Sequence, residues 1–172
     1  ILFEVIEGEN IELQNNKFII ADKLLSNLIE KCKITKLNIL KKFKGKDLKG
    51  INCIHPFSGK GYDFDVPLIS GSFVEENEGT GFVHIAPPYG EDDYNLALEN
   101  NITILDIVKD DGCYKDNTPI FSGIHVFKAH STVIEELKKV KSLIGIRAYT
   151  HSYPHSWRSK KPIIFRTTPQ WF

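Results

Sequence analysis

Short β-prone runs, broken at close intervals by Gly, Pro, Asn and Asp, are the feature that most limits how this sequence can fold. Such spacing is typical of a β-barrel or a β-sandwich. Eight runs are predicted to be strands: Ile1–Glu7, Lys17–Ile20, Ile34–Phe43, Leu48–Ile54, Val66–Val74, Gly81–Ala86, Ile102–Val108 and Ile163–Thr167. We therefore expect a mainly β fold with peripheral α-helices.

Three segments carry helical spacing instead. The first follows Asp22, whose side chain suits an N-cap, and its apolar residues recur at helical intervals: Leu25, Leu28, Ile29 and Cys32. The second, Asp92–Asn100, opens with acids that suit the helix dipole. The third, Ser131–Val140, has Ser131 or Thr132 as its predicted cap.

Composition excludes several classes of protein. The 172 residues are 41% hydrophobic and 26% charged, which is typical of an ordinary globular domain. No run approaches 18 apolar residues, and the N-terminus lacks the pattern of a signal peptide, so neither a membrane span nor secretion is expected. Three scattered cysteines favour a reducing compartment over a disulfide framework. Methionine is absent and the sequence begins Ile-Leu-Phe, so we expect a segment of a longer protein.

Charge is balanced overall but unevenly distributed. Eight lysines lie between Lys31 and Lys49 with only Asp47 among them, whereas acids gather at 75–78 and 91–93. Such a lysine run is commonly a set of solvated strand edges, where it also discourages aggregation. Beside an acidic pocket, it would suit a nucleic-acid ligand that bears a cationic group. Both interpretations stay open on the sequence alone.

Most short catalytic motifs are missing. The glycines at 79 and 81 are followed by His84 where a dinucleotide fingerprint needs a third glycine. The Ser58–Gly61 stretch lacks the remaining residues of a phosphate-binding loop, and no GxSxG elbow is present. His151 and His155 are separated by Pro154, which disfavours a shared helix face, so no metal site is predicted.

One segment does suggest a site. GTGFVHIAPPYGEDDYNLA, residues 79–97, leads from two glycines through a short apolar run to a Pro-Pro turn and an acidic helix start. Such a unit could place His84 and one acidic side chain on opposite walls of a pocket. The glycines would let a ligand approach the backbone closely. A core histidine and a helix that simply begins with acids are the structural alternative.

This segment closely resembles the editing site of isoleucyl-tRNA synthetases. HSYPHSWRSKKPIIFRTTPQWF, residues 151–172, resembles the stretch by which the editing insertion of that family returns to the aminoacylation domain, and DGCYKDNTPIFSGIHVFKAH, residues 111–130, is similar to the segment between the two. The resemblance is strong over residues 66–172 and diffuse over 1–65. His84 favours the isoleucyl over the valyl family, which resembles it with a lysine at that position.

The resemblance implies a role for each matching residue. Asp93 would hold the α-ammonium group of a misattached amino acid, and His84 would line its side-chain pocket and help to exclude isoleucine. Both stand as the candidate catalytic residues. Gly79, Thr80, Gly81, Val83 and Ala86 would line the same substrate cavity.

The resemblance also implies an architecture: a β-barrel editing domain over residues 1–150 and a return connector over 151–172. The threonine-rich editing peptide of the family would lie upstream of Ile1, so the fragment alone is expected to be weak or inactive. No ATP-binding signature is present, and ATP would act elsewhere in the parent enzyme; no cofactor is expected in this domain. A cytoplasmic location is implied, with the rest of the synthetase and tRNA(Ile) carrying misattached valine at its 3′ end as partners.

The function implied is hydrolysis of the ester in misacylated Val-tRNA(Ile) by an aminoacyl-tRNA ligase that joins isoleucine to tRNA(Ile) with ATP. No side chain stands out as a nucleophile or general base. Two alternatives stay open. One is an RNA-binding module without catalysis, which would use the lysine run and aromatics such as Tyr62, Phe64 and Trp157. The other is a metal-dependent hydrolase built on His84 and the acidic cluster.

Overall fold

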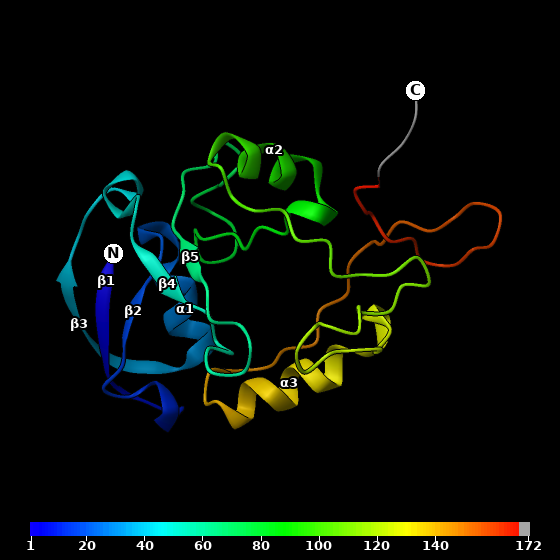
Figure 1. Cartoon of the computed structure of the whole chain (residues 1–172). Coiled ribbons are helices and arrows are strands. Elements are labelled where there is room, and N and C mark those ends of the chain that lie inside the picture. Colours follow the sequence, from blue (N-terminus) through cyan, green and yellow to red (C-terminus); the bar gives the residue numbers. More distant parts are fainter. Residues whose placement is uncertain (169–172) are drawn as a thin grey trace. The chain divides into compact units, whose positions relative to one another are not determined.

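The computed structural model describes residues 1–168 (Figure 1). The chain forms two compact units. The first comprises Ile1–Cys53 and Val66–His84, and the second comprises Ile54–Asp65 and Ile85–Phe172, whose last four residues lie outside the described part.

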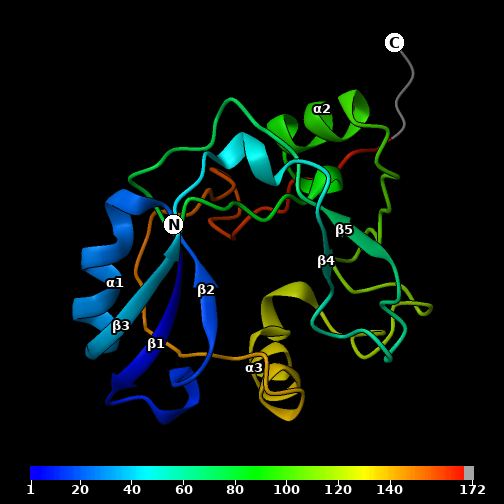
Figure 2. The same ribbon diagram turned by 90° about the vertical axis from the view of Figure 1, so that its left-hand side faces the viewer.

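A three-stranded antiparallel sheet forms the centre of the first unit (Figure 2). Its strands are β1 (Leu2–Gly8), β2 (Lys17–Ile19) and β3 (Ile34–Lys41), in the order β2-β1-β3. A short 3₁₀ turn, η1 (Ile11–Leu13), lies between β1 and β2. The middle strand therefore has a hydrogen-bonded neighbour on each side, while β3 forms an edge.

Alternation along β1 builds the core of this unit. Phe3 and Val5 are fully buried, because side chains two residues apart in a strand point to the same face. Helix α1 (Leu25–Cys32) follows the 3₁₀ turn η2 (Asp22–Leu24) and covers this core with the predicted apolar residues, which confirms their spacing: Leu25, Leu28, Ile29 and Cys32.

The lysine run follows the solvated edge of this sheet. Lys36 and Lys41 lie on edge strand β3 and are exposed. Lys33 forms an ion pair with Glu9, and Lys42 forms one with Asp22 at 3.0 Å. The interpretation of these lysines as a solvated strand edge is therefore confirmed for β3.

A second sheet contains only two short strands, β4 (Asn52–Ile54) and β5 (Asp65–Pro67). The boundary between the two units runs through both strands. The 3₁₀ turn η3 (Gly45–Leu48) takes part of the predicted run before β4. The strands predicted at 48–54 and 66–74 are therefore present but much shorter.

The second unit relies on helices and turns. Its helices are α2 (Glu91–Glu99) and α3 (His130–Lys139), with 3₁₀ turns η4 (Pro87–Tyr89) and η5 (Val126–Lys128). Its buried apolar residues are Phe57, Leu96, Ala97, Val108, Phe121 and Ala129. Lys60 ties the turn at 57–61 to α3 through an ion pair of 2.8 Å with Glu136.

The predicted fold class is confirmed in its mainly β character, with α1, α2 and α3 as the accompanying helices. The sheets are open among residues 1–168, so the described residues form no closed barrel. The three cysteines are free thiols. No helix in the described part of the chain is long and apolar enough to cross a membrane.

Three predicted strands are wrong, and their backbone hydrogen bonds explain why. In 81–86, the Ala86 N–H donates to the Asp93 carboxylate, and two prolines follow. In 102–108, the Ile107 N–H donates to the Tyr89 hydroxyl, and only Val108 forms an isolated bridge. In 163–167, the Ile163 N–H closes a short hairpin on the Pro154 carbonyl, and the Thr167 N–H donates to the Pro88 carbonyl, so the two ends have different partner segments. Because a backbone group that is bonded elsewhere cannot join a ladder, none of these three segments continues as a strand.

The predicted helix caps are also wrong. Asp22 begins the turn η2 and directs its carboxylate to Lys42 instead of capping α1. Helix α3 begins at His130 with Ala129 as its N-cap and no side-chain cap bond, so neither Ser131 nor Thr132 caps it. Because η5 runs almost directly into α3, the helix begins before the hydroxyl residues are reached.

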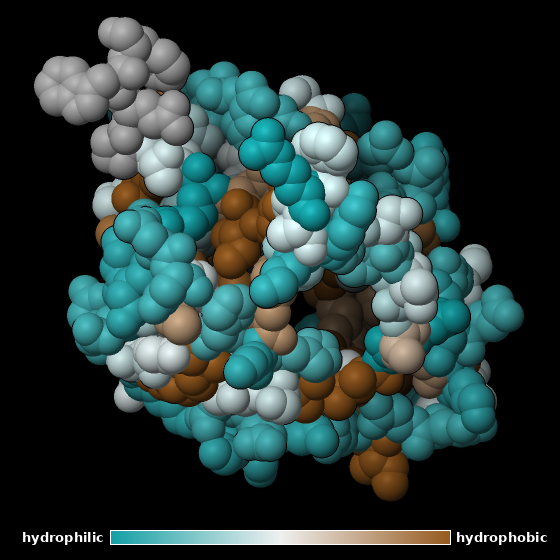
Figure 3. All heavy atoms as spheres, turned by 90° about the vertical axis from the view of Figure 1, so that its right-hand side faces the viewer, coloured by the Kyte–Doolittle hydropathy of each residue, from teal (hydrophilic) through white to brown (hydrophobic). Residues whose placement is uncertain are grey.

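Exposed apolar side chains are numerous, and on the face shown in Figure 3 they reach the surface at several separate places among hydrophilic ones. Scattered exposure of this kind is normal for protein surfaces.

Candidate active site

The segment 79–97 that suggested a site is divided between the two units, with the boundary after His84. Gly79, Thr80, Gly81, Val83 and His84 belong to the first unit, and Ala86 and Asp93 belong to the second. Within its own unit, each group has a defined local environment. The expectation that His84 and Asp93 face one pocket stays a prediction.

The Gly79–Gly81 turn is anchored to the start of η2. The Thr80 carbonyl accepts a hydrogen bond of 2.9 Å from the Ala21 N–H, and both glycines have positive φ angles of 61° and 81°. A Cβ at Gly81 would lie 2.6 Å from the Ala21 Cβ, whereas one at Gly79 would meet nothing within 4 Å. Gly81 is therefore required by packing, and only Gly79 has open space for close approach by a ligand.

Val83 and His84 follow this turn in an irregular segment, and both side chains are exposed, Val83 at 53%. The buried-histidine alternative is therefore wrong for His84. An exposed imidazole next to an exposed isopropyl group can contact a small ligand through either polar or apolar surface.

Asp93, the last of the three acids at the start of α2, is held by a hydrogen bond within the fold. It occupies the third helical position after Gly90, is half-buried, and accepts a 2.7 Å hydrogen bond at Oδ2 from the Ala86 N–H. A Cβ at Gly90 would lie 3.2 Å from that oxygen, so the glycine leaves room for the carboxylate to reach back. Asp92, by contrast, is exposed.

This geometry leaves Asp93 with a second oxygen. Oδ1 has no hydrogen bond to any of residues 1–168, while Oδ2 fixes the orientation of the carboxylate. An ionised carboxylate oriented in this way can accept a charge-assisted hydrogen bond from an ammonium group. The arrangement brings together Ala86 and Asp93, two of the predicted substrate-binding residues.

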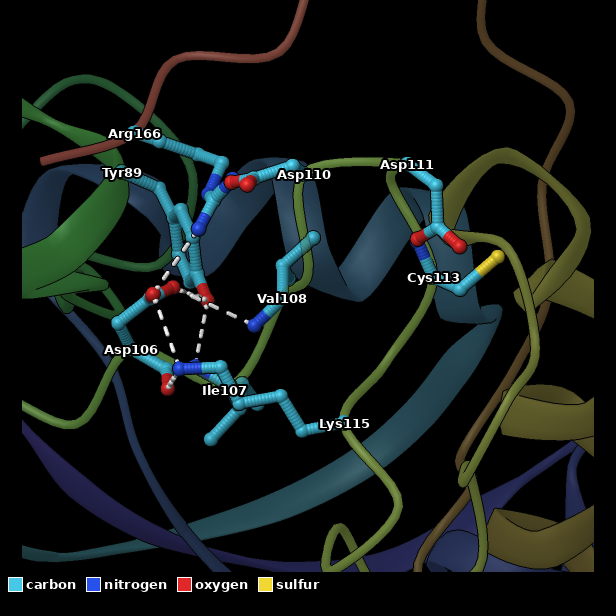
Figure 4. Close-up of polar contacts among 9 residues, drawn as sticks. All are labelled: Tyr89, Asp106, Ile107, Val108, Asp110, Asp111, Cys113, Lys115 and Arg166. Carbon is cyan, nitrogen blue, oxygen red and sulfur yellow. Dashed lines mark hydrogen bonds and ion pairs between the residues drawn. The ribbon is translucent and has the colours of Figure 1, made fainter. Parts of the chain in front are cut away.

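A polar network that includes Tyr89 of the turn η4 was not predicted from the sequence (Figure 4). Asp106 is at its centre, and its carboxylate contacts Arg166 at 3.0 Å, Lys115 at 3.1 Å and the Tyr89 hydroxyl at 3.3 Å. Arg166 also contacts Asp110 at 2.8 Å. These bonds tie η4, which leads into α2, to segments far along the chain.

The network shifts the ionisation of its members. Burial acts to raise the pKa of Asp106, but hydrogen bonds from Lys115 and Arg166 outweigh it and hold that pKa below its ordinary value. Burial raises the pKa of Tyr89. Hydrogen bonds to Asp110 and Asp106 raise the pKa of Arg166. Asp106 is therefore a stable anion whose main task here is structural.

The network also anchors the end of the described chain. Beside the Arg166 contacts, the Thr167 N–H donates to the Pro88 carbonyl at 2.8 Å, and Arg166 lines an open hollow together with Lys109, Asp110, Asp111 and Lys115. Residues 151–168 thus belong to the second unit. Their predicted role as a return connector is untested, and its last residues, 169–172, lie outside the described part.

No sequence signal marks this network, because its members lie up to 77 positions apart (89 to 166) and follow no regular spacing.

The aromatic side chains considered for RNA stacking differ in how accessible they are to a ligand. Tyr62 stacks on His55 and donates to the Pro119 carbonyl, whereas Trp157 is 78% exposed. In residues 1–168, no three His, Cys, Asp or Glu side chains are grouped as a metal site requires.

Comparison with known proteins identifies the class of protein to which this chain belongs. No family model matches the sequence. The chain is 47% identical over 165 residues to the isoleucine–tRNA ligase of Pelagibacter ubique, which is 96% of this chain and 18% of that protein. It is 44% identical over 156 residues to that of Idiomarina loihiensis, which is 91% and 16% of the two chains. It is 41% identical over 171 residues to that of Shewanella woodyi, which is 99% and 17%.

These similarities place the chain among the aminoacyl-tRNA synthetases. More particularly, it is homologous over nearly its whole length to one segment of the isoleucine–tRNA ligases, and it spans less than a fifth of the length of these relatives.

Proposed function

We propose that this chain edits tRNA charging by hydrolysing the ester that joins a misattached valine to tRNA(Ile). In the same proposal, it acts within a ligase that joins isoleucine to tRNA(Ile) with ATP, which is bound elsewhere, and its partners are the rest of that synthetase and the misacylated 3′ end. The observation that carries the proposal is the Asp93 carboxylate, which is oriented through Oδ2 by Ala86 and available through Oδ1.

Physical chemistry explains why such a step is useful. Valine lacks one methylene of isoleucine, and a binding pocket gains only ~1–3 kcal/mol from that group; isoleucyl-tRNA synthetases are themselves the known example of this limit. A second site that admits valine and rejects isoleucine by size supplies the missing discrimination. The Asp93 carboxylate would fix the α-ammonium of the ester, and water would attack the carbonyl carbon and release valine from the ribose oxygen.

No described side chain is assigned as the base for that water. Positioning of the ester relative to water accounts for much of the rate in this proposal, because a well-oriented reactant avoids a large entropic cost. A ribose hydroxyl of the tRNA is a further group that could orient the water.

The test is deacylation of Val-tRNA(Ile) by the full-length ligase that contains this segment. Asp93→Ala removes a charge-assisted hydrogen bond of ~1.5–3 kcal/mol, and misplacement of the ester adds to the loss, so hydrolysis should nearly vanish while isoleucine activation is unchanged. Asp92→Ala is the matched control and should be mild, since Asp92 is exposed. Normal editing by Asp93→Ala with loss in Asp92→Ala would refute the assignment.

His84 has a separate test, because its proposed role is selectivity. His84→Ala enlarges the pocket, so the ligase should begin to hydrolyse correctly charged Ile-tRNA(Ile). A general base would instead give a uniform loss of hydrolysis with no gain toward isoleucine. The two roles therefore predict opposite changes for Ile-tRNA(Ile).

The alternatives have their own discriminating measurements. An RNA-binding module without catalysis would bind Val-tRNA(Ile) without releasing valine. A metal-dependent hydrolase would retain stoichiometric metal on purification, which elemental analysis detects. The cytoplasmic location expected with the resemblance stays a prediction that cell fractionation would test.

A further inference from the structure

Residues 141–168 have a charge composition unlike the rest of the chain. They contain six cations and no acid, although the whole chain has 22 of each sign. The six are Lys141, Arg147, Arg158, Lys160, Lys161 and Arg166. Among the described residues, only Arg166 is paired with carboxylates. Five cations without acidic partners produce a local positive potential that attracts phosphate groups.

A series of rings follows the same segment at every second position. Tyr149 and His151 are stacked, with ring centroids 5.8 Å apart and an interplanar angle of 15°. His151 contacts Tyr153 edge to face at 6.2 Å, and Tyr153 contacts His155 in the same way at 6.2 Å. All four side chains are exposed, Tyr149 at 83%. The rings support one another, but the outermost face is left to solvent.

The series continues into a small hairpin between Pro154 and Ile163 (orange to red in Figure 1). It is closed by hydrogen bonds from the Ile163 N–H to the Pro154 carbonyl at 3.1 Å and from the Ser156 N–H to the Lys161 carbonyl at 2.9 Å. Its turn places Lys160 at a positive φ of 57°. A non-glycine residue in that region is held there by its surroundings.

The tip of the hairpin combines an aromatic ring with several charges. Trp157 is 78% exposed, and Arg158, Lys160 and Lys161 follow it in the turn of the hairpin. The adjacent cations disfavour a basic partner through like-charge repulsion. An exposed flat ring followed by several cations matches an unpaired base and its phosphates.

We infer that the ring series 149–155 and the hairpin tip 156–161 together form a binding surface for single-stranded RNA. Bases stack on Tyr149 and Trp157, while the cations contact the phosphates. Unpaired strands are selected because the faces of their bases are accessible, which those of a duplex are not. The identification of that RNA with the unpaired 3′ end of tRNA rests on the proposed function; the affinity for single-stranded RNA does not.

The test uses the 172-residue chain carrying Trp171→Phe, which leaves Trp157 as its single tryptophan, and a short oligoadenylate as the probe. Binding should quench the Trp157 fluorescence. Tyr149→Ala should weaken the affinity roughly five- to a hundredfold, as expected for loss of one stacked base. Arg158→Gln with Lys160→Gln should reduce the slope of log affinity against log salt by about 1.4.

The matched control is Lys46→Gln with Lys49→Gln, which removes two exposed lysines of the earlier run and should leave binding nearly unchanged. Three results would overturn the inference. They are absence of fluorescence quenching, a loss of affinity in this control pair equal to that of Arg158→Gln with Lys160→Gln, and equal affinity for a duplex of the same length. Docking of another protein segment on this surface would give the first of these results. Asp93→Ala should bind oligoadenylate normally, so failure of hydrolysis and failure of RNA binding are distinguishable.

Discussion

The sheet of the first unit and the segment 85–129 of the second are stabilised by different kinds of contact. In the sheet, backbone groups pair in ladders, and Phe3 and Val5 are fully buried. In 85–129, side chains accept or donate the bonds that a ladder would otherwise supply, as Tyr89, Asp93 and Asp106 do. Both regions bury apolar side chains, but the sheet is completed by backbone ladders, whereas 85–129 relies in addition on individual polar side chains.

Truncation of the sheet core should produce the largest effect. Phe3→Ala leaves a cavity beneath β1 and should cost about 3–5 kcal/mol in the free energy of unfolding. Urea denaturation measures the loss, and hydrogen exchange should locate it in β1, β2 and β3. Ile39→Ala is the control on the same sheet, since Ile39 is 53% exposed, and should cost less than about 0.5 kcal/mol. Equal losses would break the comparison.

Disruption of the polar network around Asp106 should lower the free energy of unfolding by less, and the loss should be located in the second unit. Asp106→Asn removes the negative partner of Arg166, whose side chain is only 16% exposed, and should cost about 1–3 kcal/mol. Exchange should increase for the amides of Ile107 and Val108. The control is Asp116→Asn, because Asp116 is 87% exposed in its pair with Lys109 and should contribute under about 1 kcal/mol.

Acid should remove the stabilisation that the Asp106 carboxylate gives to the polar network. The folded-state pKa of Asp106 lies below its ordinary value of 3.8, so its stabilisation is present above that pH and is lost as pH falls through the folded-state pKa. The stability difference between the original chain and Asp106→Asn should therefore shrink below about pH 4. A difference that stays constant down to about pH 2 would contradict the assigned role of this carboxylate.

The same contrast explains what the sequence could predict. Periodicity identified β1, β2, β3 and α1, because their apolar residues face one core. It also located α2 and α3 to within one or two residues. It failed at 102–108, where Ile and Val alternate as in a strand, because the partners of Ile107 and Val108 are the side chains of Tyr89 and Asp106. Tyr89 is 18 positions from Ile107, and side-chain partners of this kind leave no periodic pattern in the sequence.

The candidate site shows the same division. Resemblance to a family pointed to Asp93, but only the structure shows the Ala86 bond that orients it and the contact with Ala21 that accounts for Gly81. The Arg166 anchor could not have been found, since an arginine 60 positions from its partner Asp106 has no motif to mark it.

The most direct test of the account is to separate the two tasks of Asp93. Asp93→Asn keeps an oxygen that can accept the Ala86 N–H but removes the negative charge proposed to hold the α-ammonium. The measurement is Val-tRNA(Ile) deacylation by the full-length ligase, with the unfolding midpoint of the 172-residue chain measured in parallel. We expect an unchanged unfolding midpoint and nearly complete loss of deacylation. Deacylation at the original rate by the Asp93→Asn variant would show that the charge of Asp93 does not bind the substrate.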